Sequence, residues 1–259
     1  MKYLVHLAAL AACAAPFCLA DSAEDANKSN NPLNPAPGLN FQDYYSPSLY
    51  GTDKYTNDFL LRGTLPIAPG FVPVPQLIRA TVPISTRPDP DGGNGTALGD
   101  INLFDIFLFG NKELQLGIGP LLTLPTATHD YLGTGKWQAG LAAVVVNPTP
   151  QRLLGALVQW QHSFAGDADR SNVNTATLQP FLIWNLPQGW YLRSTGTWSF
   201  NLNNGEGYIP VGFGFGKAWR DGKTVYNAFI EPQVTVWHEG DGQPHWTIFT
   251  GLNLTLGNL

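Results

Sequence analysis

Apolar and polar residues alternate along most of the chain after residue 37. Between residues 113 and 123, Leu114, Leu116 and Ile118 share one face, whereas Gln115 and Gly117 share the other. A period of two is typical of β-strands, in which successive side chains point to opposite faces of the sheet. We find no helical period of any length in this part of the sequence. The pattern therefore predicts an all-β protein.

Twelve segments of this kind follow one another, and turn-forming residues separate them. They span residues 38–45, 56–67, 75–85, 98–110, 113–124, 137–147, 152–164, 174–186, 190–201, 208–219, 224–237 and 245–257. The connections after even-numbered segments are mostly short, such as 110–112 and 187–189. Those after odd-numbered segments are longer and more polar, such as 86–97 and 125–136. An even number of strands with short turns at one end and longer loops at the other is typical of an outer-membrane β-barrel.

A closed barrel meets a strict requirement of the membrane. In hydrocarbon, every backbone N–H and C=O needs a partner within the protein, and a sheet provides these partners only when it closes on itself. About 9–11 tilted residues cross the apolar layer, which matches the predicted segments. Trp184 and Trp190 flank a short connection, whereas Trp137 and Trp160 lie near long ones, as expected of aromatic girdles at the two interfaces. We predict a transmembrane antiparallel β-barrel of about 12 strands.

Two features do not fit a regular barrel. Pro120, Pro180 and Pro232 fall within predicted strands, where each removes a ladder hydrogen bond. Residues 101–109 are apolar on both faces, with Asp105 among them, so the pattern does not fix their orientation. The alternative fold is a secreted sandwich or lipocalin-like barrel, which would bury the apolar faces within its own core.

The first twenty residues have a different character. Lys2 is their only charge, and most of the residues that follow are apolar. This is typical of a secretory signal peptide, with cleavage near Ala20. Cys13 offers an alternative, because residues 10–13 resemble a lipoprotein acylation motif. We expect three parts: a signal peptide over 1–20, a flexible periplasmic lead-in over 21–37 and the barrel over 38–259.

Composition excludes several classes of protein. An aromatic content of 12% excludes a disordered chain, and 28 glycines and 21 prolines argue against a helical bundle. The formal net charge is −5, and no stretch clusters lysine and arginine, so we expect no nucleic-acid partner. Charged residues make up only 13% of the chain. A surface that faces lipid accounts for this low charge.

Residues 119–128 (GPLLTLPTAT) and 132–137 (LGTGKW) resemble the MetA-pathway phenol-degradation family of bacterial outer-membrane proteins, which includes neuromedin U-like members. Further stretches that fit the family are residues 99–100, 172–174, 178–181, 189–192, 209–212 and 216–217. The resemblance implies an outer-membrane barrel that passes small compounds, aromatic ones among them. One departure lies at residues 255–259 (TLGNL), where outer-membrane barrels usually end on an aromatic residue that the insertion machinery reads.

The polar faces of the predicted strands supply candidate lumen-lining residues. Among them amides outnumber each type of charge, and the three arginines and two glutamates could pair and close the lumen. A strongly ion-selective pore would instead carry a ring of one sign. The candidates are Arg62, Arg79, Glu113, Gln115, Gln138, Gln159, Gln161, Gln179, Arg193, Glu231 and Gln233.

We expect no catalytic residue, cofactor or metal. His162 and Ser163 are adjacent and so point to opposite faces of a strand. In a twelve-stranded outer-membrane phospholipase family, by contrast, the catalytic His and Ser lie two residues apart on one face. Both cysteines, Cys13 and Cys18, fall within the predicted signal peptide, which leaves no thiolate metal site in the mature chain.

The leading functional hypothesis is passive passage of small molecules through the lumen, by size exclusion and hydrogen bonding. Residues 21–37 or an outer loop would gate this passage. The alternatives are a closed structural or surface-interaction barrel and, third, an outer-membrane hydrolase. The expected partners are outer-membrane lipid, a small-molecule solute and the barrel-insertion machinery, and the expected location is the bacterial outer membrane.

Overall fold

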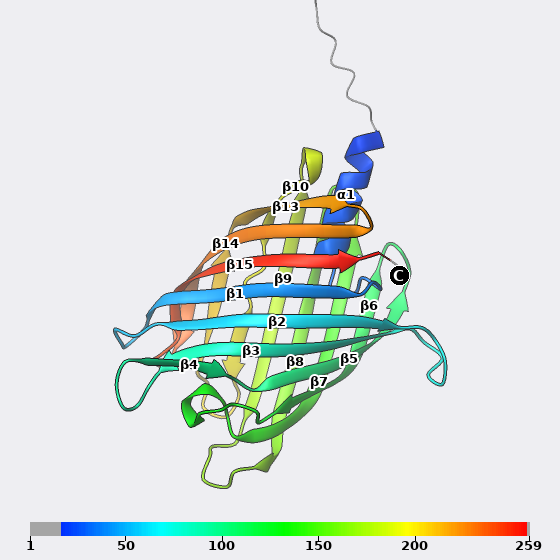
Figure 1. Cartoon of the computed structure of the whole chain (residues 1–259). Helices are drawn as coiled ribbons and strands as arrows, with labels where there is room; N and C mark the ends of the chain where they lie inside the picture. The colour runs from blue at the N-terminus through cyan, green and yellow to red at the C-terminus, as the bar shows by residue number, and fades with distance from the viewer. Residues whose placement is uncertain (1–16, 258–259) are drawn as a thin grey trace, which may run out of the picture.

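The computed structural model describes residues 17–257, whose strands form one closed antiparallel sheet (Figure 1). β1 (Gly38–Leu49) pairs with β2 on one side and with β15 on the other, which closes the barrel. The other strands are β2 (Thr56–Ile67), β3 (Gln76–Pro88), β4 (Asn94–Leu98), β5 (Ile101–Gly110), β6 (Gln115–Leu124), β7 (Lys136–Pro148), β8 (Arg152–Gly166), β9 (Asn174–Asn185), β10 (Trp190–Ser194), β11 (Trp198–Asn201), β12 (Gly207–Gly212), β13 (Gly214–Asp221), β14 (Thr224–Glu239) and β15 (Pro244–Leu256).

Three crossings of the wall consist of two strand segments each. β4 and β5 both pair with β3, β10 and β11 both pair with β9, and β12 and β13 both pair with β14. The wall therefore has 12 crossings, and each predicted segment corresponds to one of them. The predicted antiparallel barrel is confirmed, and the alternative sandwich is wrong.

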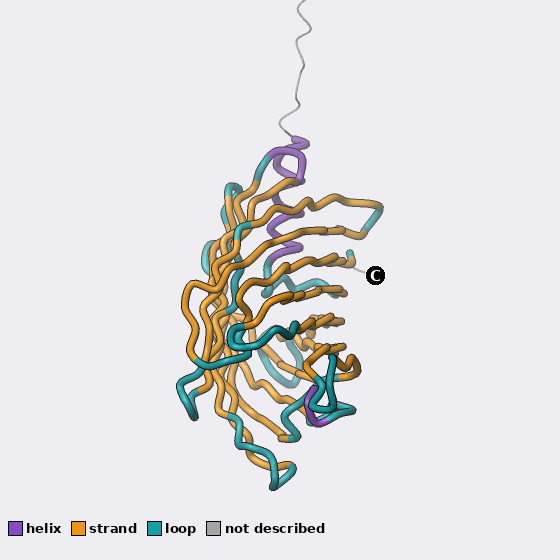
Figure 2. The backbone as a smooth tube through the Cα atoms, turned by 90° about the vertical axis from the view of Figure 1, so that its left-hand side faces the viewer, coloured by secondary structure: helices purple, strands orange, loops and turns teal. Residues whose placement is uncertain are grey.

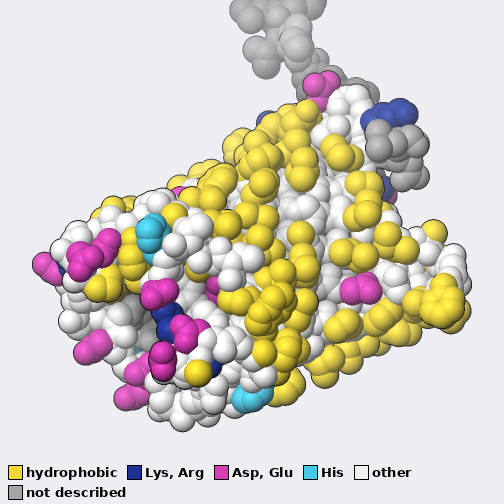
Figure 3. All heavy atoms as spheres, turned by 60° about the horizontal axis from the view of Figure 1, so that its bottom comes forward, with side chains coloured by type: hydrophobic (Ala, Val, Ile, Leu, Met, Phe, Trp, Pro, Cys, Tyr) yellow, Lys and Arg dark blue, Asp and Glu magenta, His cyan; other side chains and the backbone are white. Residues whose placement is uncertain are grey.

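The alternation in the sequence separates the two faces of the wall. In β6, Leu116 and Ile118 are exposed on the outside, whereas Gly117 and Gly119 are buried on the inside. Exposed leucine, valine and tryptophan side chains recur around the barrel, and Figure 3 shows hydrophobic side chains covering much of its outer wall. Charged side chains gather at one end of the barrel in that view. Such an outer surface is suited to hydrocarbon between two polar layers.

The structure fixes the orientation of β5, which the sequence left open. Asn102 donates a hydrogen bond to Thr123 across the inner face, at 2.9 Å. Phe104 lies on the same face as Asn102. Asp105 therefore lies on the outer face, paired with Ile78 of β3. A carboxyl group consequently stands among lipid-facing neighbours.

Prolines lie opposite breaks in the ladders at three places, one of which is the break between β12 and β13, where the Phe213 N–H donates to the Pro232 backbone oxygen of β14. The pairing of β5 with β6 skips Asp105 and Ile106, which lie opposite Pro120 and its neighbour. The crossing formed by β10 and β11 is interrupted at residues 195–197, where Pro180 of β9 and Pro210 of β12 lie on either side. Because proline has no N–H to donate, a regular ladder cannot continue there.

The two ends of the barrel differ, although one predicted loop is wrong. Residues 86–97 were expected to be a polar loop, but β3 extends through Pro88 and pairs with β4 as a hairpin. Only residues 89–93 form the turn, with Gly92 and Gly93 at positive φ. Longer connections at this end follow β6 and β8. At the opposite end the turns are short, as at 111–114 and 149–151.

A helix enters the barrel at the short-turn end, where a flexible lead-in was expected. α1 (Phe17–Asn30) packs against the inner sides of β9, β13, β14 and β15 and against the short 3-10 turn η2 (Pro187–Gly189) (Figures 1 and 2). A second 3-10 turn, η1 (Asp130–Leu132), lies in the connection between β6 and β7. No helix in the described part of the chain is long and apolar enough to cross a membrane. Most of the predicted signal peptide, residues 1–16, lies outside the described residues.

Candidate functional site

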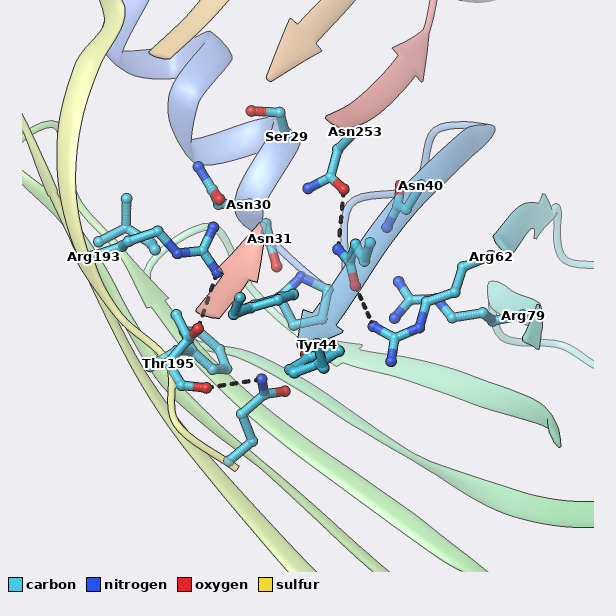
Figure 4. A pocket seen from close by; sticks show the side chains of 16 residues that line it. Ser29, Asn30, Asn31, Asn40, Tyr44, Arg62, Arg79, Arg193, Thr195 and Asn253 are labelled. Atoms are coloured by element: carbon cyan, nitrogen blue, oxygen red, sulfur yellow. Dashed lines mark hydrogen bonds between the residues drawn. The ribbon is translucent and has the colours of Figure 1, made fainter. Parts of the chain in front are cut away.

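Three cavities follow one another along the lumen. The inner cavity, of about 100 Å³, is bounded by Asn30 and Asn31 at the end of α1 (Figure 4). The middle cavity, of about 250 Å³, shares Tyr44, Arg62 and Arg79 with the inner one. The outer cavity, of about 230 Å³, shares Tyr44 with both of the others. The lumen therefore contains a series of small polar compartments beside a packed apolar cluster that includes Leu33, Leu77 and Ile106.

Side chains of α1 anchor the helix in the mouth of the barrel. Asp25 is buried and forms an ion pair with Arg220 of β13. Asn27 donates to the backbone oxygen of Thr149 at 2.7 Å and accepts from Asn185 at 2.9 Å. These bonds join the helix to the ends of β9 and β13 and to the turn between β7 and β8, so the helix is fixed within this mouth.

We call α1 and the residues that follow it, through Leu33, the plug. Contacts of its exposed part and of its last residues are as follows. The Lys28 ammonium nitrogen lies 2.6 Å from a carboxylate oxygen of Glu24. The hydrogen bond and the positive charge of Lys28 hold the pKa of the Glu24 carboxyl below its ordinary value. After the helix, Asn31 donates to Gln115 of β6 at 2.7 Å. Leu33 packs into the space left by Gly117, where a Cβ would lie 2.7 Å from the leucine side chain.

Two arginines of neighbouring strands project into the inner and middle cavities. Arg62 of β2 donates to Gln42 at 2.6 Å, and Arg79 of β3 donates to Thr64 at 3.0 Å. The guanidinium of Arg79 also lies 5.1 Å from the ring centre of Phe104. Among the described residues, neither arginine forms an ion pair with a carboxylate. Both positive charges are therefore balanced only by neutral hydrogen-bond acceptors.

A buried network replaces the missing ladder at the break in the wall. The Glu231 carboxylate accepts from the Thr195 backbone N–H at 2.7 Å and from its hydroxyl at 2.7 Å. Gln179 donates to the Thr195 backbone oxygen at 3.0 Å. Arg193 donates to Glu231 at 2.7 Å, and its guanidinium lies 3.5 Å from the ring centre of Phe229. Side chains in the lumen thus satisfy the backbone that the strands on either side cannot.

The outer cavity contains a second, more accessible ion pair. Both carboxylate oxygens of Asp58 accept from Arg87 at 2.8 Å, and Ser85 donates to Asp58 at 2.6 Å. Tyr208 lines the same cavity. One guanidinium nitrogen of Arg87 donates to both oxygens, and because the pair is neutral as a whole, it adds little net charge to the outer end of the lumen.

Most of the candidate residues face the interior of the barrel. Arg62, Arg79, Gln179 and Arg193 line the inner cavity, Gln159 lines the middle one and Gln233 the outer one. The remaining inward-facing candidates make hydrogen bonds instead: Gln115 with Asn31, Gln138 with Thr134, Gln161 with Thr123 and Glu231 with Arg193.

Glu113 is the exception, because it lies in an exposed turn before β6. The Asn111 side chain accepts from the backbone N–H groups of Glu113 and Leu114, at 2.8 and 2.9 Å. This local turn delays the start of β6 to Gln115. The assignment of Glu113 to the lumen is therefore wrong, and the lumen loses one of its two predicted glutamates.

Sequence reasoning missed several residues of the lumen. Tyr44 and Phe104 line cavities although they are aromatic and stand in apolar surroundings in the sequence. Asp58 and Arg87 were not selected, although Asp58 shares the face of Arg62 by its even spacing. Asn30 was missed because a flexible segment was expected there. Periodicity could have found Asp58, and also Arg87, which shares the face of Arg79 but lies beyond the predicted end of its strand at residue 85.

The residues considered for hydrolysis do not come together. His162 is exposed on the outer face of β8, whereas Ser163 is buried and donates to the Val173 backbone oxygen at 3.4 Å. No cluster of three or more potential metal ligands occurs among the described residues. The lumen network instead consists of amides, hydroxyls and guanidinium groups, with the Glu231 and Asp58 carboxylates each paired to an arginine.

Comparison with known proteins relates the fold to outer-membrane barrels. No family model matches the chain, and no curated protein matches it by sequence. An outer membrane channel from Pseudomonas putida F1 is 12% identical, with a TM-score of 0.62 over 85% of this chain and 95% of that one. The NanC porin is 8% identical, with a TM-score of 0.55 over 85% of this chain and 100% of that one.

A weaker likeness is to an outer-membrane enzyme. Outer membrane phospholipase A from Escherichia coli is 10% identical, with a TM-score of 0.42 over 85% of this chain and 92% of that one. A likeness this low carries no argument about activity. The closed sheet, its apolar outer wall and the two stronger likenesses identify the chain as a β-barrel of the bacterial outer membrane.

Proposed function

We propose that this barrel is a passive channel for small molecules, and that α1 restricts its short-turn mouth. The observation that carries the proposal is the series of three cavities, which share residues and are lined mainly by polar side chains. A solute that enters the outer cavity can exchange its hydration for bonds to hydroxyls, amides and guanidinium groups. The folds of a channel and a porin are in keeping with this role.

The size of the cavities limits the solutes. The largest of the three is about 250 Å³, below the range of most drug-binding pockets. The channel therefore selects by size first and by hydrogen bonding second. The resemblance of residues 119–128 and 132–137 to the phenol-degradation family supports aromatic compounds among these solutes and membership of that family.

The conductance of the purified barrel in a planar bilayer tests the proposal. We compare the full chain with a variant that lacks residues 22–30 and with a control, Asp25→Asn, that removes only the ion pair to Arg220. We expect small current steps from the full chain, larger steps from the deletion and an intermediate response from the control. A heat-dependent gel shift establishes that each variant is folded.

The anchoring of α1 by Asp25 and Asn27 also supports the second candidate, a closed structural barrel. Folded protein that gives no current steps, with or without residues 22–30, would contradict the channel and favour the closed barrel. Current steps from the deletion alone would indicate a channel that is plugged at rest.

A further inference from the structure

We infer that Arg62 and Arg79 form a binding site for small organic carboxylates in the lumen. This inference deepens the proposed function, on which its transport test rests. The sequence predicts three arginines and two glutamates in the lumen, but it does not show whether these residues pair. The structure removes Glu113 from that balance and engages Glu231 with Arg193. Two uncompensated positive charges therefore remain.

The linings of the two cavities have a single sign. Neither the inner nor the middle cavity is lined by an aspartate or glutamate among the described residues, whereas Arg62 and Arg79 line both. Glu231 is fully buried behind Arg193. The C-terminal end of α1 points its carbonyl groups toward the inner cavity and contributes about half a negative charge, which is smaller than the arginine excess. The interior therefore attracts anions.

The register of the strands brings the two arginines together. Arg79 is paired with Thr64, and Arg62 is paired with Thr81, so that the arginines are diagonal neighbours on one face of β2 and β3. Side chains in this relation lie within reach of a common ligand. Figure 4 shows the two guanidinium groups close to one another at the cavity wall.

Each arginine has donors available for a ligand. A guanidinium carries five N–H donors; Arg62 uses donors toward Gln42 and Tyr44, and Arg79 uses one toward Thr64, so most donors of each group are left for a ligand. Carboxylates match this planar fork in a bidentate manner, which makes such contacts shorter and stronger than neutral hydrogen bonds. The site therefore favours a carboxylate over a neutral solute of the same size.

Aromatic side chains beside the arginines suit a ligand with a ring. Phe104 lies beneath Arg79, and Tyr44 lines both cavities. A benzoate-sized solute can place its carboxylate at the arginine pair and its ring against these side chains within a space of about 250 Å³. Benzoate is therefore the probe of choice, and benzamide is its neutral counterpart.

Direct binding is measured on folded protein in detergent by ligand-observed NMR. We expect benzoate to bind and benzamide to bind at least about tenfold more weakly, because one charge-assisted contact is worth about a factor of ten. The variant Arg62→Gln/Arg79→Gln should lose benzoate binding by a similar factor. The control Lys112→Gln/Arg152→Gln removes two positive charges from the short-turn end, outside the cavities, and should bind as the natural chain does. Equal binding of benzoate and benzamide, or unchanged binding in the first variant, would overturn the inference.

Ion selectivity in a potassium chloride gradient provides the transport test. We expect the natural chain and the control to favour chloride, and the arginine variant to lose this preference. A conducting channel with no chloride preference overturns the inference but leaves the channel intact. A folded barrel that never conducts but binds benzoate through Arg62 and Arg79 supports the site and contradicts the channel. If the double variant does not fold, Arg79→Gln alone serves, and unchanged benzoate binding there counts against the site.

Discussion

Replacement of Glu231 by alanine tests whether the buried network holds the broken crossing together. Glu231 is fully buried and Arg193 is 6% exposed. The substitution leaves a buried guanidinium without its carboxylate and the Thr195 N–H without an acceptor. Breaking a buried pair by removing one partner costs about 3–5 kcal/mol. The ring of Phe229, 3.5 Å from the guanidinium, still stabilises that charge. We therefore expect the lower end of this range, about 3 kcal/mol.

The free energy of unfolding is measured by urea titration in lipid vesicles, followed by tryptophan fluorescence. Glu231→Gln keeps one acceptor for Thr195 and should cost less, about 1–2 kcal/mol. Thr195→Val removes the hydroxyl but keeps the backbone bond, and should cost about 1 kcal/mol. The combined variant Arg193→Met/Glu231→Leu should recover only part of the loss, because the Thr195 backbone still lacks its partner. A loss below about 1 kcal/mol for Glu231→Ala would show that the reasoning is wrong.

Three further predictions concern the wall. Val158→Lys, on the outer face of β8, should destabilise the barrel by about 2–4 kcal/mol. Gln159→Lys, in the middle cavity, should be tolerated. Equal urea midpoints for the two variants would contradict the assigned faces. Gly140→Ala should cost about 1–3 kcal/mol in the same titration, because its Cβ would lie 1.8 Å from the Trp160 backbone oxygen, whereas Gly63→Ala meets nothing within 4 Å and should be neutral. Asp105→Leu should stabilise the barrel by about 1 kcal/mol, since it replaces a lipid-facing carboxyl, and a destabilised variant would indicate an unrecognised partner for that carboxyl.

The alternation of residues was sufficient to predict the wall, because a barrel exposes each strand to lipid on one side and to the lumen on the other. In β6 every outward-facing residue is apolar, and Leu121 is the one large apolar side chain that faces inward. The rule fails where a local turn overrides it, as at Glu113, which follows an asparagine that bonds the backbone. It also cannot orient β5, in which the inner face carries Phe104 and the outer face carries Asp105.

The plug could not be predicted from the sequence for a different reason. Residues 21–30 contain asparagine, serine and aspartate, which favour helix ends and turns over helix interiors. The helix is stabilised by bonds to distant parts of the barrel, such as Asp25 to Arg220 and Asn27 to Thr149. The balance of charge in the lumen depended likewise on contacts between distant strands. Three arginines were visible in the sequence, but only the structure showed that one of them is neutralised.

The anchoring of α1 has a consequence for the order in which the protein matures. Asp25 bonds an arginine 195 positions further along the chain, on one of the last strands to be synthesised. The helix α1 therefore cannot make this contact until nearly all strands of the barrel have been synthesised. The seam itself joins β1 to β15, so closure also awaits the final strand. Contacts between such distant positions form slowly, since the entropy of a long loop is lost before they contribute. We expect the barrel to close first, with its short-turn mouth still empty. The docking of α1 into that mouth is then the last step of folding.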